Sequence, residues 1–124
     1  MPGASKDSTP ISAENPNYVS RSAELGDFTV AFETLRAGAD PAPFFKGLSD
    51  DRCPCPHWGL VVSGRLIMRY RDHQEIFEPG DAFYLTPGHL PLAPTDTEII
   101  TFSPTTELMK VNVVMAKNRT VIQS

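Results

Sequence analysis

The chain has 124 residues, which is enough for one domain with a modest core and too short for two. Its 11 Lys and Arg residues are outnumbered by 15 Asp and Glu residues, so the net charge of −4 offers no basic surface to nucleic acid or an anionic membrane, and neither is expected as a partner. No apolar run approaches the roughly 18 residues of a membrane span and no secretory signal is visible, so a cytoplasmic protein is expected.

The N-terminal stretch, residues 1–26, is predicted to be a flexible arm. It is rich in Ser, Pro, Ala and Asn, and its few large apolar residues follow neither the period of a strand nor that of a helix. The folded part of the chain is therefore expected to start after it.

The globular domain, residues 27–118, opens with a strand-like pattern. Phe28, Val30 and Phe32 recur at every second position, as expected when one face of a strand is buried. Glu33 has the opposite parity and is expected to face solvent.

A proline-rich segment follows, which cannot be a central strand because proline lacks a backbone donor. Its prolines are Pro41, Pro43, Pro54 and Pro56. This segment is predicted to be loop or sheet edge.

Short β-prone segments then alternate with turns. The segments are 57–63, 65–71, 75–77, 82–85 and 97–102, and the turns fall at Gly64, Asp72-His73, Gly80-Asp81 and Pro87-Gly88. This spacing predicts an all-β sandwich or barrel. Phe77, Phe83 and Phe102 are expected in its core, because aromatic residues at strand spacing usually fill it.

The segment after Phe102 favours a short C-terminal helix within residues 104–118. Ser103 to Glu107 supply a hydroxyl cap and an acidic first turn, although the valines that follow fit a strand equally well. Residues 119–124 are predicted to be a tail. Either form leaves an apolar face that needs a partner, so a homodimer is expected.

The glycines and polar residues of the barrel segment resemble the two signature motifs of the cupins. In the first motif a glutamate stands seven residues before a glycine. Here His57 holds that glutamate position before Gly64, and Cys53 holds the position of a histidine four residues earlier.

The second cupin motif is represented by its glycines, Gly80 and Gly88. Thr86 takes the position of its proline and Pro91 that of its histidine, with His89 two residues earlier. The usual metal ligands of the family are therefore replaced at every position.

The resemblance implies a cupin-type double-stranded β-helix, or jelly-roll barrel, over about residues 43–103. The run from Cys53 to Gly59 and the run from Gly88 to Pro91 also look like those of a group of small bacterial cupins without an established activity.

A metal site is the main functional hypothesis. Cys53, Cys55 and His57 lie at every second position, which would point three side chains to one face of an extended segment. Thiolates and imidazole suit Zn²⁺ best and Fe²⁺ or Mn²⁺ less well. The cupin frame would bring His89 to the same end of the barrel as a fourth ligand. The alternative is that the prolines break the alternation, the thiols pack as small apolar groups and the histidines hydrogen-bond across the barrel mouth.

Trp58 and Tyr70 are the candidates for a ligand pocket, because each joins an apolar ring to a polar atom. Two functions remain open. One is a module that binds a metal ion or small molecule in the barrel mouth, and the other is a metal-dependent enzyme, such as an oxygenase or isomerase, acting on a small organic substrate.

Overall fold

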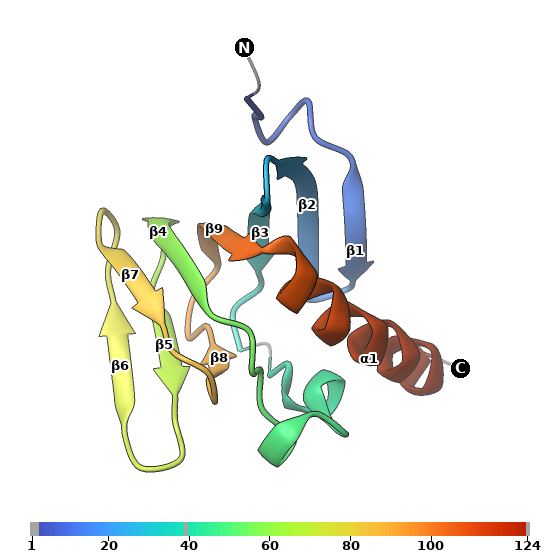
Figure 1. Cartoon of the computed structure of the whole chain (residues 1–124). Coiled ribbons are helices and arrows are strands. Elements are labelled where there is room, and N and C mark those ends of the chain that lie inside the picture. Colours follow the sequence, from blue (N-terminus) through green and yellow to red (C-terminus); the bar gives the residue numbers. More distant parts are fainter. Residues whose placement is uncertain (1–2, 39, 124) are drawn as a thin grey trace.

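The computed structural model describes residues 3–38 and 40–123, which form two antiparallel sheets and a C-terminal helix (Figure 1). The strands are β1 (Ile11–Asn15), β2 (Tyr18–Leu25), β3 (Phe28–Leu35), β4 (His57–Ser63), β5 (Leu66–Arg69), β6 (Gln74–Phe77), β7 (Ala82–Leu85), β8 (Leu90–Leu92) and β9 (Thr97–Pro104). Two 3₁₀ turns, η1 (Ala42–Phe45) and η2 (Ser49–Asp51), interrupt the proline-rich segment, and the helix α1 spans Thr105–Gln123.

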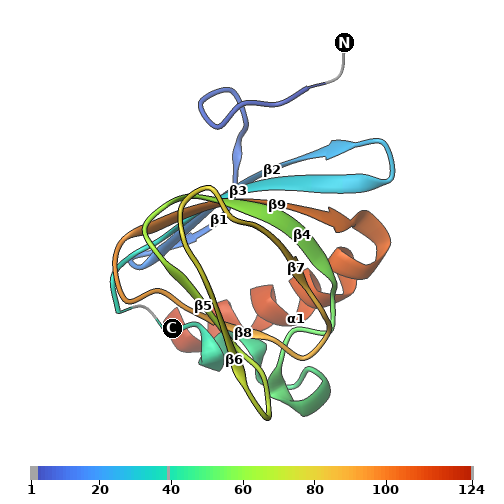
Figure 2. The same cartoon turned by 90° about the vertical axis from the view of Figure 1, so that its left-hand side faces the viewer.

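The larger sheet has six strands in the order β1-β2-β3-β9-β4-β7, and the smaller has three in the order β6-β5-β8. The two sheets curve around a common interior (Figure 2). The core between them consists of Leu35, Val61, Leu66, Met68, Phe83, Leu85, Ala93 and Ile99, all 6% exposed or less. The molecule is therefore a β-barrel whose two sheets are held together by this core.

The helix α1 lies below the concave side of the larger sheet (Figures 1 and 2). Its Asn118 side chain donates hydrogen bonds to the carbonyl oxygens of Phe44, at 2.7 Å, and Lys46, at 2.8 Å. Val111 is buried against Phe45. These contacts fix α1 to η1, which lies at the start of the proline-rich segment. No helix in the described part of the chain is long and apolar enough to cross a membrane.

The all-β barrel and the C-terminal helix are confirmed. The helix is longer than expected and continues through most of the predicted tail, residues 119–124, of which residue 124 lies outside the described residues. β4 and β7 have the predicted bounds. β8 is so short and so rich in proline that its sequence carried no strand pattern.

The N-terminal segment differs from the predicted arm. Residues 11–25 form a hairpin, β1–β2, whose second strand pairs with β3 along its whole length, from Tyr18 opposite Leu35 to Leu25 opposite Phe28. The turn is stabilised by Asn15, whose side-chain oxygen accepts a hydrogen bond from the Asn17 amide at 2.8 Å. The hairpin was hidden in the sequence because several residues on its inner side, such as Ser20 and Ser22, are serines.

The inner face of β3 is the opposite of the predicted one. Phe28 is 39% exposed on the outer side of the sheet, whereas Ala31, Glu33 and Leu35 face the interior. Val30 shares the parity of Phe28 and is buried as predicted, at 2% exposed. Phe102, expected in the core, also points outward and is 41% exposed, unlike Phe83 at 6%. Small and polar side chains on the inner face leave space inside the barrel, so the apolar alternation marked the outer face.

Candidate metal centre and cavity

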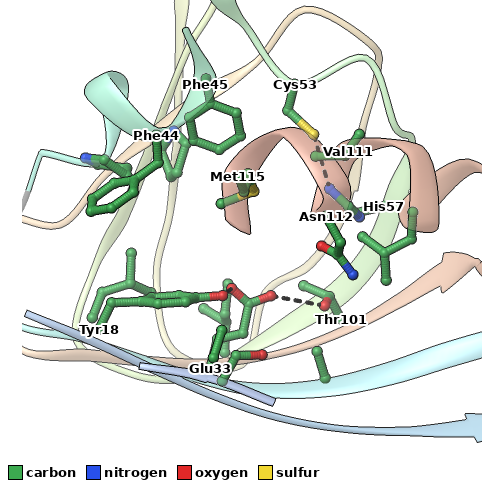
Figure 3. Close-up of a pocket in the computed structure, with 18 of the residues that line it drawn as sticks. Tyr18, Glu33, Phe44, Phe45, Cys53, His57, Thr101, Val111, Asn112 and Met115 are labelled. Carbon is green, nitrogen blue, oxygen red and sulfur yellow. Dashed lines mark hydrogen bonds between the residues drawn. The ribbon is translucent and has the colours of Figure 1, made fainter. Parts of the chain in front are cut away.

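The barrel encloses a cavity of about 640 Å³ between the larger sheet and α1 (Figure 3). Its apolar walls include Leu35, Phe45, Met68, Leu85, Ile99, Val111 and Met115. Its polar groups include Tyr18, Glu33, Cys53, His57, His89 and Thr101. A volume of this size accommodates a small organic molecule, and an apolar pocket with a few polar groups is the usual form of a ligand site.

Cys53 and His89 are brought together by backbone pairing. The two residues form an isolated antiparallel bridge, in which the Cys53 amide donates to the His89 carbonyl at 3.0 Å. The Gly88 amide donates to the Cys53 carbonyl at 2.8 Å. Residues opposite each other in such a pair project side chains to the same side, and both are 2% exposed.

His57 is the first residue of β4 and its imidazole reaches the same place. Its Nε2 atom lies 3.5 Å from Cys53 Sγ, and its Nδ1 atom lies 2.5 Å from Ser103 Oγ on β9. Trp58 pairs with Phe102, so the next position along each strand sets His57 opposite Ser103. The ring is thus held at both nitrogens.

The candidate ligand atoms of Cys53, His57 and His89 all lie within 4.8 Å of one another. A tetrahedral Zn²⁺ with usual bond lengths separates its sulfur and nitrogen ligands by about 3.4 to 3.6 Å. The thiol and the nearer imidazole already match that spacing, and the widest pair needs to close by about 1 Å. This donor set therefore fits a metal ion.

The outer nitrogens of both rings are fixed by hydrogen bonds of the kind that support metal-binding histidines. His89 Nδ1 donates to the carbonyl oxygen of Thr86 at 2.7 Å, which leaves the lone pair on Nε2. With the same tautomer, His57 donates from Nδ1 to Ser103 Oγ and has its lone pair on Nε2, toward Cys53. Both imidazoles thus carry a lone pair on Nε2, and the candidate ligand atoms lie within 4.8 Å of one another.

Burial sets the protonation of the three groups without a metal. Desolvation, with a smaller contribution from the neighbouring His89, lowers the pKa of His57 to about 3. Desolvation also lowers the pKa of His89, while its bond to Thr86 opposes that change. The pKa of Cys53 is raised to about 12, mainly by burial. At neutral pH the imidazoles are therefore ready to coordinate, and only the thiol must lose a proton.

Cys55 lies apart from this group. It occupies a bend between Pro54 and Pro56, and its thiol donates to the Pro56 carbonyl at 3.4 Å. Its side chain, 1% exposed, belongs to the apolar cluster of Phe45 and Val111. The fixed φ angles of the two prolines interrupt the alternation that would have aligned Cys55 with Cys53.

Trp58 and Tyr70, the predicted pocket residues, do not line this cavity. Trp58 is 41% exposed on the outer face of β4 and stacks on Tyr84, with ring centroids 5.0 Å apart. Tyr70 packs against the barrel core and stacks on His73, and it meets His89 only edge-on, with centroids 6.4 Å apart.

Glu33 is the polar residue of the cavity that sequence reasoning placed outside. Tyr18 donates a hydrogen bond to its Oε2 atom at 2.9 Å, and Thr101 donates to its Oε1 atom at 3.2 Å. Burial raises the pKa of Glu33, and these two hydrogen bonds oppose that change. The sequence did contain a hint, because the apolar Leu35 lies two residues after Glu33 and therefore on the same face of β3. In the structure Leu35 is 3% exposed.

No protein-family model matches the chain, and no curated protein matches its sequence. Solved structures do match its fold. An RmlC-like cupin from Shewanella frigidimarina superposes with a TM-score of 0.60 at 17% identity, covering 82% of this chain and 88% of that one. Ectoine synthase from P. lautus has a TM-score of 0.55 at 14% identity, covering 74% of this chain and 67% of that one.

HppE, solved as its Fe(II) form, superposes with a TM-score of 0.60 at 13% identity, covering 83% of this chain and 60% of that one. These similarities concern the fold alone, because the sequences are so different. They agree with the two-sheet barrel of this chain. The chain is therefore a small domain of the cupin fold.

Proposed function

We propose that Cys53, His57 and His89 hold a divalent metal ion, with Zn²⁺ as the preferred metal, and that the protein binds a small organic molecule at this metal inside the cavity. The observation that carries the proposal is the convergence of one thiol and two imidazole lone pairs within 4.8 Å on the wall of a cavity. Three protein ligands leave a position open to a ligand, as in catalytic rather than structural zinc sites.

The chain's own residues supply the positioning. Thr86 and Ser103 orient the two imidazoles, and the Cys53–His89 bridge ties two distant segments at the site. When bound, the metal would polarise an oxygen donor of the ligand as a Lewis acid. Fe²⁺ is the alternative ion, because nitrogen-rich open sites also suit iron and a structural neighbour is solved as Fe(II) HppE.

The first test is the metal content of protein purified without an affinity tag, measured by elemental analysis. We expect close to one zinc or iron per chain, as purified or after supply of the metal. Less than about a tenth of a metal per chain after both metals are supplied would overturn the proposal.

The two cysteines provide a matched pair of variants for a spectroscopic test. Cobalt(II) bound by a thiolate gives a charge-transfer absorption that a sulfur-free site lacks. Cys53→Ser should abolish this band, whereas Cys55→Ser, which changes a buried thiol two residues away, should keep it. Loss of the band in Cys55→Ser alone would contradict the proposed ligand set.

A metal-dependent enzyme is the second candidate function, and Glu33 favours it. A catalytic centre needs an acid or base that the metal does not occupy, and this carboxyl lines the same cavity (Figure 3). Turnover of a small molecule that is lost in both Glu33→Gln and His57→Ala would identify an enzyme.

A further inference from the structure

The cavity has a second polar pole, which consists of Glu33 with Tyr18 and Thr101. In Figure 3 Tyr18 and Glu33 lie on the sheet side of the cavity, opposite Cys53, and Thr101 lies at the end of the cavity nearer His57. The two hydroxyl groups donate to different oxygens of the carboxylate. Both donors favour the ionised form and leave each oxygen able to accept another hydrogen bond.

This carboxyl has no positive partner among the described residues. No Lys, Arg or His side chain there forms an ion pair with Glu33, and only burial and the two hydroxyl groups shift its pKa. Glu33 is half-buried on the cavity wall, and a carboxylate that is partly removed from water without an opposite charge is unfavourable. A neutral side chain would serve packing better, so the carboxyl is best explained by a ligand that brings the missing charge.

The two poles carry opposite charges once a metal is present. A divalent ion with one thiolate has a net positive charge and ionised Glu33 is negative, and the wall of the cavity that they share also includes Leu35, Met68 and Ile99. The cavity would therefore present groups of opposite charge beside apolar walls.

We propose that this cavity takes a small aliphatic amino acid or a related zwitterion, with its ammonium group bound by Glu33, Tyr18 and Thr101 and its carboxylate directed to the metal. The carboxylate of Glu33 is the anchor, and the two hydroxyl groups position it. An ammonium group supplies both the positive charge and several donors, whereas an alcohol supplies one donor and no charge. The metal half of this inference rests on the proposed function, and the Glu33 half does not.

The experiment measures binding by calorimetry with two sets of probes. The first probe is n-butylammonium, compared with n-butanol, on protein stripped of metal by a chelator. The second set is an ω-amino acid series, from glycine to 5-aminovalerate, compared with the matching alkyl carboxylates on zinc-loaded protein. Each titration is repeated on Glu33→Gln, on Tyr18→Phe, and on Glu24→Gln as a control with the same charge change at an exposed position of β2.

We expect n-butylammonium, but not n-butanol, to bind the metal-free protein, with at least tenfold weaker binding in Glu33→Gln. Tyr18→Phe should give a smaller loss, and Glu24→Gln none. On the zinc-loaded protein, one chain length of the amino acid series should bind tighter than its alkyl carboxylate, and Glu33→Gln should remove that advantage. Since Glu33→Gln replaces a buried charge with a neutral isostere, it should fold at least as stably as the parent protein.

Equal binding of the amine and the alcohol, or an unchanged affinity of Glu33→Gln for the amine, would overturn the assignment of Glu33. Binding of n-butylammonium that depends on Glu33, combined with no effect of zinc on the amino acids, would support the ammonium anchor and overturn the metal pole. Zinc-dependent binding that is equally tight for the amino acids and the alkyl carboxylates would support the metal pole and overturn the ammonium anchor. The two proposals therefore fail separately.

Discussion

Removal of the Ser103 hydroxyl should weaken metal binding without changing any ligand. Ser103 is 1% exposed and its Oγ atom is 2.5 Å from Nδ1 of His57. When Nε2 binds a metal, the ring must carry its proton on Nδ1, and Ser103→Ala leaves that donor buried without its partner. An unpaired buried donor costs about 1–3 kcal/mol.

That cost corresponds to an increase in Kd of about 5- to 150-fold. It matches the loss of about 10- to 100-fold that is typical when the hydrogen-bond partner of a metal-binding histidine is removed. The metal-free protein should lose less stability, because without a metal the imidazole proton can move to Nε2. The penalty should therefore appear mainly in the metal affinity.

The assay is a competition titration with a chelating indicator, on protein stripped of metal, at one fixed pH. Ser103→Thr keeps a hydroxyl and should retain most of the affinity. Ser20→Ala is the control, because Ser20 is another buried serine of the same cavity that makes no side-chain hydrogen bond to the candidate ligands. A Kd for Ser103→Ala within about threefold of the parent value would refute the role assigned to Ser103.

Three further results are expected. Glu33→Gln should change the pH dependence of stability, because above pH 4.5 the carboxyl ionises in the unfolded chain but its raised pKa resists ionisation in the folded protein. The free energy of unfolding of the parent protein should therefore fall by up to about 1.4 kcal/mol per pH unit relative to the variant, until the pH reaches the raised folded pKa. Parallel curves of unfolding free energy against pH, measured by urea unfolding, would contradict this. Gly59→Ala should cost about 3 kcal/mol or prevent folding, because its Cβ atom would collide with the Ile100 carbonyl and the Phe83 ring; unfolding within about 0.5 kcal/mol of the parent would exclude that clash. The expected homodimer should form through the exposed aromatic side chains on the outer face around Trp58, so Trp58→Lys should give a monomer by light scattering, and an unchanged mass would place any interface elsewhere.

The sequence predicted the central strands well, because their inner residues are large and apolar. Leu66 and Met68 share one face of β5, with Arg65, Ile67 and Arg69 on the other, and both are fully or nearly fully buried in the core. The turns that separate these strands need glycine: Gly64 has a φ of 83° and Gly80 a φ of 88°. Local chemistry and global fold agree in this region, so periodicity alone located the strands.

Prediction failed where the barrel is hollow. A strand beside a cavity carries small or polar inner residues, such as Ala31, Glu33 and Ser20, and its larger apolar residues can face outward. Period-two alternation gives the two faces of a strand but does not say which one is inside. For that reason the face of Phe28 was misassigned and β2 was missed.

The candidate site was partly visible in the sequence. Cys53, His57 and His89 are brought together by the Cys53–His89 bridge, which joins segments far apart in the chain and leaves no local pattern. The position of Cys55 depended on the backbone at Pro54 and Pro56, which residue spacing does not specify. Glu33 could not be assigned before the inner face of β3 was known.

The walls of the cavity that come from the β1–β2 hairpin and α1 limit how far the chain can be truncated at either end. All three candidate metal ligands lie inside the barrel segment, but Tyr18 comes from the first quarter of the chain and Val111 and Met115 come from the last. A chain trimmed to residues 27–103 would keep the metal-binding side chains and lose two walls of the cavity. When this domain is grafted onto another protein or changed by laboratory evolution, the two ends of the chain should therefore be kept together with the barrel, since they determine which molecules fit the cavity.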